Sequence, residues 1–113
     1  MTMKNVKVPT SDSYQDYLIS RLKDPTYAAL YLETHMEEEK DNEPELLRLA
    51  FDNVLQALSS STMSFDQAEL HRQKLDEILS QPGSLAIYGL AIWLNELGLK
   101  LTVVVADQNL EKQ

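Results

Sequence analysis

Proline and glycine divide this chain into short helical stretches, and that division constrains its fold more than any other feature. A proline is tolerated at the first position of a helix, where its missing N–H would have no partner, so Pro25 and Pro44 mark helix starts. Pro82-Gly83 must end one helix before the next begins. Between these breaks, apolar residues recur every three to four positions, which predicts amphipathic helices. We therefore expect an all-α protein.

Capping residues refine where these helices begin and end. Asp24 can cap a helix that runs from Pro25 to about Glu38. Ser64 followed by Gln67 is a capping box, which sets a further helix start. The hydroxyl-rich stretch 59–62 favours a loop, because its side chains compete for backbone hydrogen bonds. Together these signals predict a bundle of five to six helices.

The last predicted helix is bounded by Ser84, a candidate cap, and by Gly98, which can end it in the left-handed conformation. The helical spacing of its large apolar residues predicts that they pack inward. These residues are Leu85, Tyr88, Ile92 and Trp93.

The segment Leu101–Val105 is short and rich in β-branched residues, so we predict a C-terminal β-strand. A lone strand cannot satisfy its own backbone groups. It pairs either with Val6–Val8 or with its copy in a second chain, and we expect the second arrangement, a homodimer. The predicted organisation is a flexible arm over 1–12, one domain over 13–105 and a flexible tail over 106–113.

Charge and cysteine content exclude several functions. The formal net charge of -8 at pH 7 disfavours nonspecific nucleic-acid binding and suits a basic protein partner. The chain has no cysteine, which excludes disulfides and thiolate nucleophiles and agrees with a reducing compartment. No run of about 18 apolar residues is present, so we expect no membrane span. The expected location is the cytoplasm.

Two blocks of the sequence share residues and spacing with a known protein family, over about 14–103. The first block consists of Tyr17-Leu18, Asp24-Pro25, Tyr31-Leu32, Glu37-Glu38, Pro44-Glu45-Leu46-Leu47 and Ala50 through Val54. The second block consists of Leu79-Ser80, Gly83, Leu94 and Leu97 through Val103. The chain thus resembles the addiction-module antidote proteins, which are HigA-like antitoxins with a Cro/repressor-type (XRE) helix-turn-helix.

This resemblance implies a lambda-repressor-like helix-turn-helix fold and the function of an antitoxin. Such a protein neutralises a basic, RelE-like toxin that cleaves messenger RNA, and it regulates transcription by binding its operator DNA as a dimer. Residues 64–70 would form the supporting helix and residues 72–80 the recognition helix. Arg72, Gln73 and Lys74 would then be the DNA-binding residues, because arginine and glutamine read base edges at the start of a recognition helix.

The segment from Ser64 to Ser80 departs from the family pattern. It lacks the glycine that usually sets the sharp turn between the two helices, and His71 is a poor substitute. Its apolar spacing continues without a break, so one uninterrupted amphipathic helix is the competing prediction. Four carboxylates also outnumber two cations here, which opposes phosphate contact. The alternative function is a toxin-neutralising protein-interaction module whose degenerate helix-turn-helix no longer binds DNA.

The acidic run Glu37, Glu38 and Glu39 is the candidate partner-binding site, because complementary charge speeds association with a basic protein. The alternative is a solvated helix surface. His35 stands without further ligands at metal spacing, and the serines at 59–61 lack a base motif. We therefore expect no enzyme, no catalytic residue, no metal, no cofactor and no small-molecule substrate.

Overall fold

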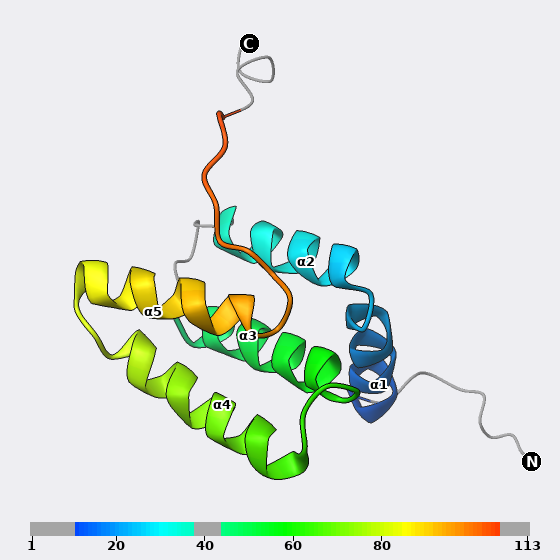
Figure 1. Cartoon of the computed structure of the whole chain (residues 1–113). Helices are drawn as coiled ribbons and strands as arrows, with labels where there is room; N and C mark the ends of the chain where they lie inside the picture. Colours follow the sequence, from blue (N-terminus) through cyan, green and yellow to red (C-terminus); the bar gives the residue numbers. More distant parts are fainter. Residues whose placement is uncertain (1–10, 38–43, 107–113) are drawn as a thin grey trace, which may run out of the picture.

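The structure is a computed structural model that describes residues 11–37 and 44–106, and five helices form in these ranges (Figure 1). No strand forms in the same ranges, so the all-α prediction is confirmed for the described part of the chain. The helices are α1 (Ser11–Leu22), α2 (Pro25–Glu37), α3 (Pro44–Ser59), α4 (Phe65–Leu79) and α5 (Gly83–Asn95).

Helix α3 lies at the centre of the bundle (Figure 1). It packs against α1, α2 and α4, whereas α5 packs against α4. Phe51 of α3 and Trp93 of α5 meet edge to face, with ring centroids 5.8 Å apart, and this contact joins α5 to the core. The largest fully buried side chains are Trp93, Phe51, Leu22, Leu75 and Val54.

Most of the predicted helix boundaries are confirmed by their capping contacts. The backbone N–H of Thr26 donates to Oδ1 of Asp24 at 3.0 Å, at the start of α2. The capping box of α4 is complete, since Gln67 N–H donates to Ser64 Oγ at 3.1 Å and Ser64 N–H donates to Gln67 Oε1 at 2.9 Å. Gly98 has φ +89° beyond the end of α5, as its predicted capping role requires.

The predicted Ser84 cap is wrong. The residue ahead of α5 is Pro82, and no side-chain hydrogen bond caps this helix. The helix begins at Gly83, whose φ of +32° lies outside the ordinary helical range. The turn after Pro82 therefore places Ser84 inside the first turn of α5, where it cannot act as the flanking residue.

Helix α4 is uninterrupted from Phe65 to Leu79, so the division into a supporting helix over 64–70 and a recognition helix over 72–80 is wrong. No turn forms at His71. Its side chain is buried, like that of Leu75 one turn later in the same helix. The three-to-four-residue spacing of apolar side chains continues across this point. It keeps one face of a single helix against the core and removes any reason for a break.

Helix α5 differs from its prediction on one side. Trp93 is buried, with 1% of its surface exposed, but Leu85, Tyr88 and Ile92 are 58%, 70% and 63% exposed. They were predicted to pack inward. The physical reason is that α4 is the one helix that packs closely on α5 among the described helices, so these residues lie beside or beyond that contact, where no other helix covers them.

The predicted strand over residues 101–105 does not form in the single chain. These residues have no regular secondary structure, although they follow the bundle as an extended segment past α2 (Figure 1). The intrachain partner considered for the strand, Val6–Val8, lies outside the described residues. Pairing with a second chain is a separate prediction that a single chain does not test.

The described residues test the predictions about the chain ends and about membrane spans only in part. The predicted arm over 1–12 and tail over 106–113 lie almost wholly outside the described residues. None of the described helices combines the length and apolar character needed to cross a bilayer.

Candidate functional site

The three predicted DNA-binding residues lie consecutively on the exposed surface of α4. Arg72, Gln73 and Lys74 are all exposed. Consecutive residues of a helix point about 100° apart, so these side chains fan around α4 and do not form one row along it. In a recognition helix the reading residues project from one face into the groove. These three residues are neighbours in the sequence, but the helix does not place them on a common face.

Arg72 contacts two carboxylates of its own chain. Its Nε lies 3.6 Å from Asp52 Oδ1 on α3, and one terminal nitrogen lies 3.5 Å from Glu69 Oε1 one turn earlier on α4. The Arg72 side chain is 46% exposed, so both pairs are partly hydrated and individually weak. A DNA phosphate would nevertheless meet two carboxylates already beside this cation.

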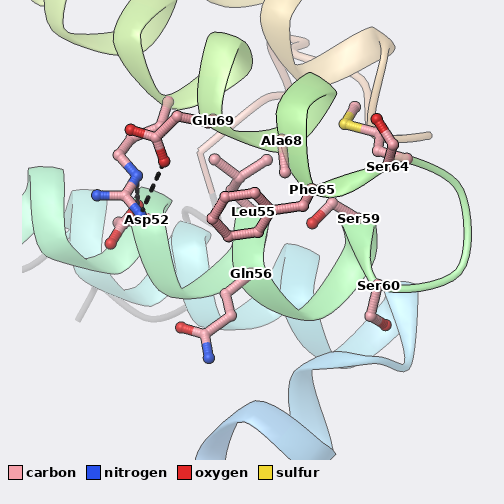
Figure 2. A pocket seen from close by; sticks show the side chains of 11 residues that line it. Asp52, Leu55, Gln56, Ser59, Ser60, Ser64, Phe65, Ala68 and Glu69 are labelled. Carbon is pink, nitrogen blue, oxygen red and sulfur yellow. Dashed lines mark ion pairs between the residues drawn. The ribbon is translucent and has the colours of Figure 1, made fainter.

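The Arg72 ion pairs lie at one end of a groove between α3 and α4 (Figure 2). The groove has a volume of about 510 Å³. In Figure 2, Phe65 and Leu55 lie in its middle, while Ser59 and Ser60 lie toward the end away from Asp52. An apolar middle with a paired cation at one end offers few unpaired polar groups to a ligand.

A second arginine at this helix contact is paired in the same way. Arg48 Nε of α3 lies 2.6 Å from Asp76 Oδ1 of α4. The hydrogen bond from Arg48, together with its charge, lowers the pKa of the Asp76 carboxyl, and the same contact raises the pKa of Arg48. The α3–α4 surface therefore satisfies its cations internally, whereas a phosphate-binding surface requires cations that face solvent.

His71 lies where the family resemblance predicted a turn, but in the structure it links α4 to α5. The His71 ring stacks on Trp93 with centroids 4.7 Å apart and an interplanar angle of 9°. Trp93 Nε1 donates to the His71 carbonyl at 2.8 Å, and His71 Nε2 donates to the Trp93 carbonyl at 3.1 Å. The remaining ring nitrogen, Nδ1, lies 3.3 Å from Glu96 Oε1.

This reciprocal contact has a structural role. Carbonyls in the last turn of a helix lack partners within the helix, and Trp93 belongs to the last turn of α5. His71 supplies the missing donor for the Trp93 carbonyl, and Leu99 N–H supplies one for Leu94 at 2.9 Å. His71 is thus a satisfied core histidine.

The predicted partner-binding residues can be placed only in part. Glu38 and Glu39 lie outside the described residues. Glu37 lines a groove of about 410 Å³ between the end of α2 and the C-terminal segment 99–104. Its apolar lining comes from both sides. The lining residues include Ala29, Leu32, Met36, Leu94, Leu99, Leu101 and Val104.

Acidic side chains and free backbone border this second groove. Glu33 and Glu37 lie one helical turn apart on the α2 side, and both are exposed. On the other side, residues 100–106 make no backbone hydrogen bond to another described residue. Residues 99–102 all line the groove, and from there on Val104 lines it while Val103 and Val105 do not, so the alternation of an extended strand is limited to residues 102–105. We call this the α2–tail groove.

Sequence reasoning found the charge of this site but missed its shape. The acidic run identified Glu37, yet nothing local to it indicated that the C-terminal valines lie alongside α2. The available signal was the apolar run Val103-Val104-Val105, which follows the end of the last helix without an assigned partner. Such a segment needs either burial or another strand.

The described residues also give no support to a metal centre. Within residues 11–37 and 44–106, no three histidine, aspartate or glutamate side chains gather as metal ligands would. His35 instead contacts the Tyr31 ring edge to face, with centroids 4.7 Å apart.

Comparisons with known proteins add no assignment. The chain matches no protein-family model, no curated protein and no solved structure.

Proposed function

We propose that this chain is a protein-binding module of the antitoxin type, which neutralises a basic toxin by holding an extended segment of it in the α2–tail groove. The observation that carries the proposal is the composition of this groove. It combines an apolar lining, two carboxylates on one side and an extended backbone on the other. The resemblance to HigA-like antitoxins supplies the class of partner.

An extended segment fits this groove for a physical reason. Residues 101–105 present backbone N–H and C=O groups that a second strand can pair with, and the side chains of residues 102–105 alternate between lining the groove and pointing away from it. Addition of a strand to such an edge gives affinity through main-chain hydrogen bonds and specificity through pockets for alternate side chains. The apolar lining provides those pockets.

The charge of the groove favours a basic occupant. Glu33 and Glu37 outnumber the one cation in the lining, Lys100. The whole chain carries a net charge of -8, so its long-range field also attracts a cationic partner. A small basic nuclease is a protein of this kind, and covering its cationic surface would keep RNA away.

Operator binding through α4 is less well supported. Helix α4 has no internal turn, Arg72 contacts Asp52 and Glu69, and carboxylates outnumber cations along the helix. A mobility-shift assay with the DNA upstream of the gene, near about 50 mM salt, should show no retarded band. A salt-sensitive band that Arg72→Ala abolishes would instead establish DNA reading by α4.

The test of toxin binding uses charge reversal. The chain is co-expressed with a small basic protein encoded by a neighbouring reading frame, and complex formation is measured by co-purification and calorimetry. Glu37→Lys should weaken binding about 10-fold or more, because it replaces an attraction by a repulsion at the groove. Asp16→Lys, the same change in net charge at an exposed residue of α1, is the matched control and should weaken binding much less.

Two outcomes would contradict the proposal. The first is failure of the wild-type chain to co-purify with the basic protein. The second is equal weakening by Glu37→Lys and Asp16→Lys, which would show that only the overall charge matters and that the α2–tail groove is not the binding site.

A further inference from the structure

The end of α5 forms a Schellman motif, in which a residue in the left-handed conformation turns the chain away from the helix. Gly98 is that residue, with φ +89°. Its N–H donates to the Asn95 carbonyl at 3.0 Å, and Leu99 N–H donates to the Leu94 carbonyl at 2.9 Å. These are the two hydrogen bonds of the motif. The backbone angle at Gly98 therefore sets the direction in which the chain leaves α5.

The same turn builds part of the α2–tail groove. Leu94 and Leu99, which the 2.9 Å hydrogen bond joins, both line this groove. An apolar contact between these two positions commonly accompanies the motif. Leu94 lies before the turn, whereas residues 99–102 and Val104 lie after it and form the side of the groove opposite α2 (Figure 1). The direction set at Gly98 therefore decides whether that side of the groove forms.

Few other contacts hold the C-terminal segment in place. Residues 100–106 make no backbone hydrogen bond to another described residue, and within the described part of the chain their side chains form no hydrogen bond or ion pair. Leu99 and Leu101 are half-buried and pack against the core. The position of residues 99–104 thus depends on two apolar side chains and on the turn that precedes them.

Gly98 acts through its backbone angle and not through a lack of space. A Cβ added at this position would meet no atom within 4 Å, so a side chain would not push against the core. The left-handed conformation is unfavourable for residues with a side chain, most of all for β-branched ones, and asparagine tolerates it best. A substitution at Gly98 therefore changes the direction that the chain prefers without creating a clash.

We propose that Gly98 is a positioning residue of the α2–tail groove. Its left-handed conformation holds residues 99–104 beside α2 before any partner binds, so the apolar lining and the free backbone edge are formed in advance. A site that is formed in advance avoids the entropy loss of ordering it on binding. The inference rests on the proposed function for the identity of the occupant, a basic toxin segment. The position of residues 99–104 itself can be measured in the free chain.

Three variants separate the backbone angle from general destabilisation. Gly98→Val places a β-branched residue at φ +89°, whereas Gly98→Asn is the conservative change that tolerates this angle. Gly83→Val is the matched control. Gly83 also has a positive φ, +32°, and no atom near its Cβ position, but it begins α5 and does not line the α2–tail groove. Circular dichroism verifies that each variant keeps its helices.

Limited digestion with trypsin, which cleaves after lysine, measures the position of the C-terminal segment without a partner. Leu97 is buried and Leu101 is half-buried, so cleavage after Lys100 requires this segment to leave the bundle. Lys74 lies inside α4, so cleavage after Lys74 reports opening of the bundle as a whole. The ratio of the cleavage rate after Lys100 to that after Lys74 therefore reports the release of the segment alone.

In Gly98→Val this cleavage ratio should rise about 10-fold above the wild-type value, because valine disfavours the turn. In Gly98→Asn and Gly83→Val it should stay within about 3-fold of the wild-type value. Calorimetry with the basic protein of the neighbouring reading frame gives the second measurement. Gly98→Val should weaken binding about 10-fold or more, since the groove must form anew at each binding event, and the other two variants should bind within about 3-fold of wild type.

Four results would overturn the positioning role. An unchanged cleavage ratio in Gly98→Val would show that the turn does not hold the segment. An equal rise in Gly98→Asn would exclude the left-handed angle as the cause. An equal rise in Gly83→Val would leave only general destabilisation. Wild-type affinity of Gly98→Val for the basic protein would show that binding does not need the turn.

Failure of the proposed function gives a different pattern. If the wild-type chain does not bind the basic protein but the cleavage ratio rises in Gly98→Val alone, the occupant is not a basic toxin and the role of Gly98 in forming the groove is supported. If the wild-type chain binds and Glu37→Lys weakens binding while Gly98→Val does not, the function stands and the positioning role is rejected.

Discussion

The α3–α4 surface and the surface formed by α5 with the C-terminal segment differ in what they leave unpaired. On the α3–α4 surface, Arg48 and Arg72 each contact a carboxylate of the neighbouring helix. On the other surface, large apolar side chains and free backbone are exposed. The first surface pairs its arginines within the chain, whereas the second leaves apolar side chains and backbone groups without partners among the described residues. The positions of cations in the sequence therefore do not show by themselves which surface is available for binding.

This difference also explains why the two functional hypotheses separate. Reading of DNA requires cations that are available to phosphates, and here Arg48 and Arg72 already contact carboxylates. Protein association draws on exposed apolar area and unpaired backbone, and these occur at the α2–tail groove and at the exposed Leu85, Tyr88 and Ile92 of α5. The predictions below test the contrast between satisfied and unsatisfied groups, from the largest expected effect to the smallest.

The largest effect is expected on the buried side of α5. Trp93→Ala removes a fully buried ring that contacts Phe51 and stacks on His71, so unfolding free energy should fall by about 3–5 kcal/mol. Urea denaturation measures the loss. Phe65→Ala, at an aromatic residue that is 82% exposed, is the control and should cost less than about 1 kcal/mol. Equal losses would mean that the buried Trp93 ring stabilises the fold no more than the exposed Phe65 ring does.

A smaller effect is expected at the tie between α4 and α5. His71→Leu keeps much of the side-chain volume but leaves the Trp93 carbonyl without its donor, which should cost about 1–3 kcal/mol. Thermal or urea unfolding provides the measurement. The exposed neighbour Gln73→Leu is the matched control and should be nearly neutral. A neutral His71→Leu would show that the hydrogen bond from the ring does not stabilise the end of α5.

The smallest effect concerns the Arg48–Asp76 pair on the α3–α4 surface. Arg48 lowers the pKa of Asp76 below its ordinary value of 3.8, so the pair stabilises the folded chain above that pH. This contribution is lost as the pH falls through the lowered pKa, when the carboxyl takes up a proton. The melting temperature of Asp76→Asn should therefore be lower than that of the wild type at pH 6. The two melting temperatures should converge as the pH falls. Asp16→Asn, at an exposed residue of α1, is the control and should leave the melting temperature close to that of the wild type at pH 6.

Local sequence signals predicted the helices well for a clear reason. Asp24, Ser64, Gln67 and Gly98 act on backbone groups a few residues away, so their roles do not depend on the rest of the fold. Proline starts at Pro25 and Pro44 are local in the same sense. The family resemblance, by contrast, predicted a turn near His71 that the apolar spacing of α4 itself opposed, and the spacing was correct.

The surfaces could not be predicted in the same way. Apolar spacing shows that a helix has an apolar side but does not show which neighbours cover it, so Leu85, Tyr88 and Ile92 were wrongly placed in the core. Likewise, the acidic run indicated Glu37 without the groove that gives it a setting. Both depend on which helices lie next to each other.

The sequence by itself determined where most helices start and end, the absence of thiol chemistry and the acidic charge. Each of these follows from residue identity or from contacts within a few positions. Tertiary structure decided that Arg72 contacts carboxylates, that His71 caps α5 and that one side of α5 remains uncovered. These features depend on residues of different helices, and the packing of whole helices sets the distances between such residues.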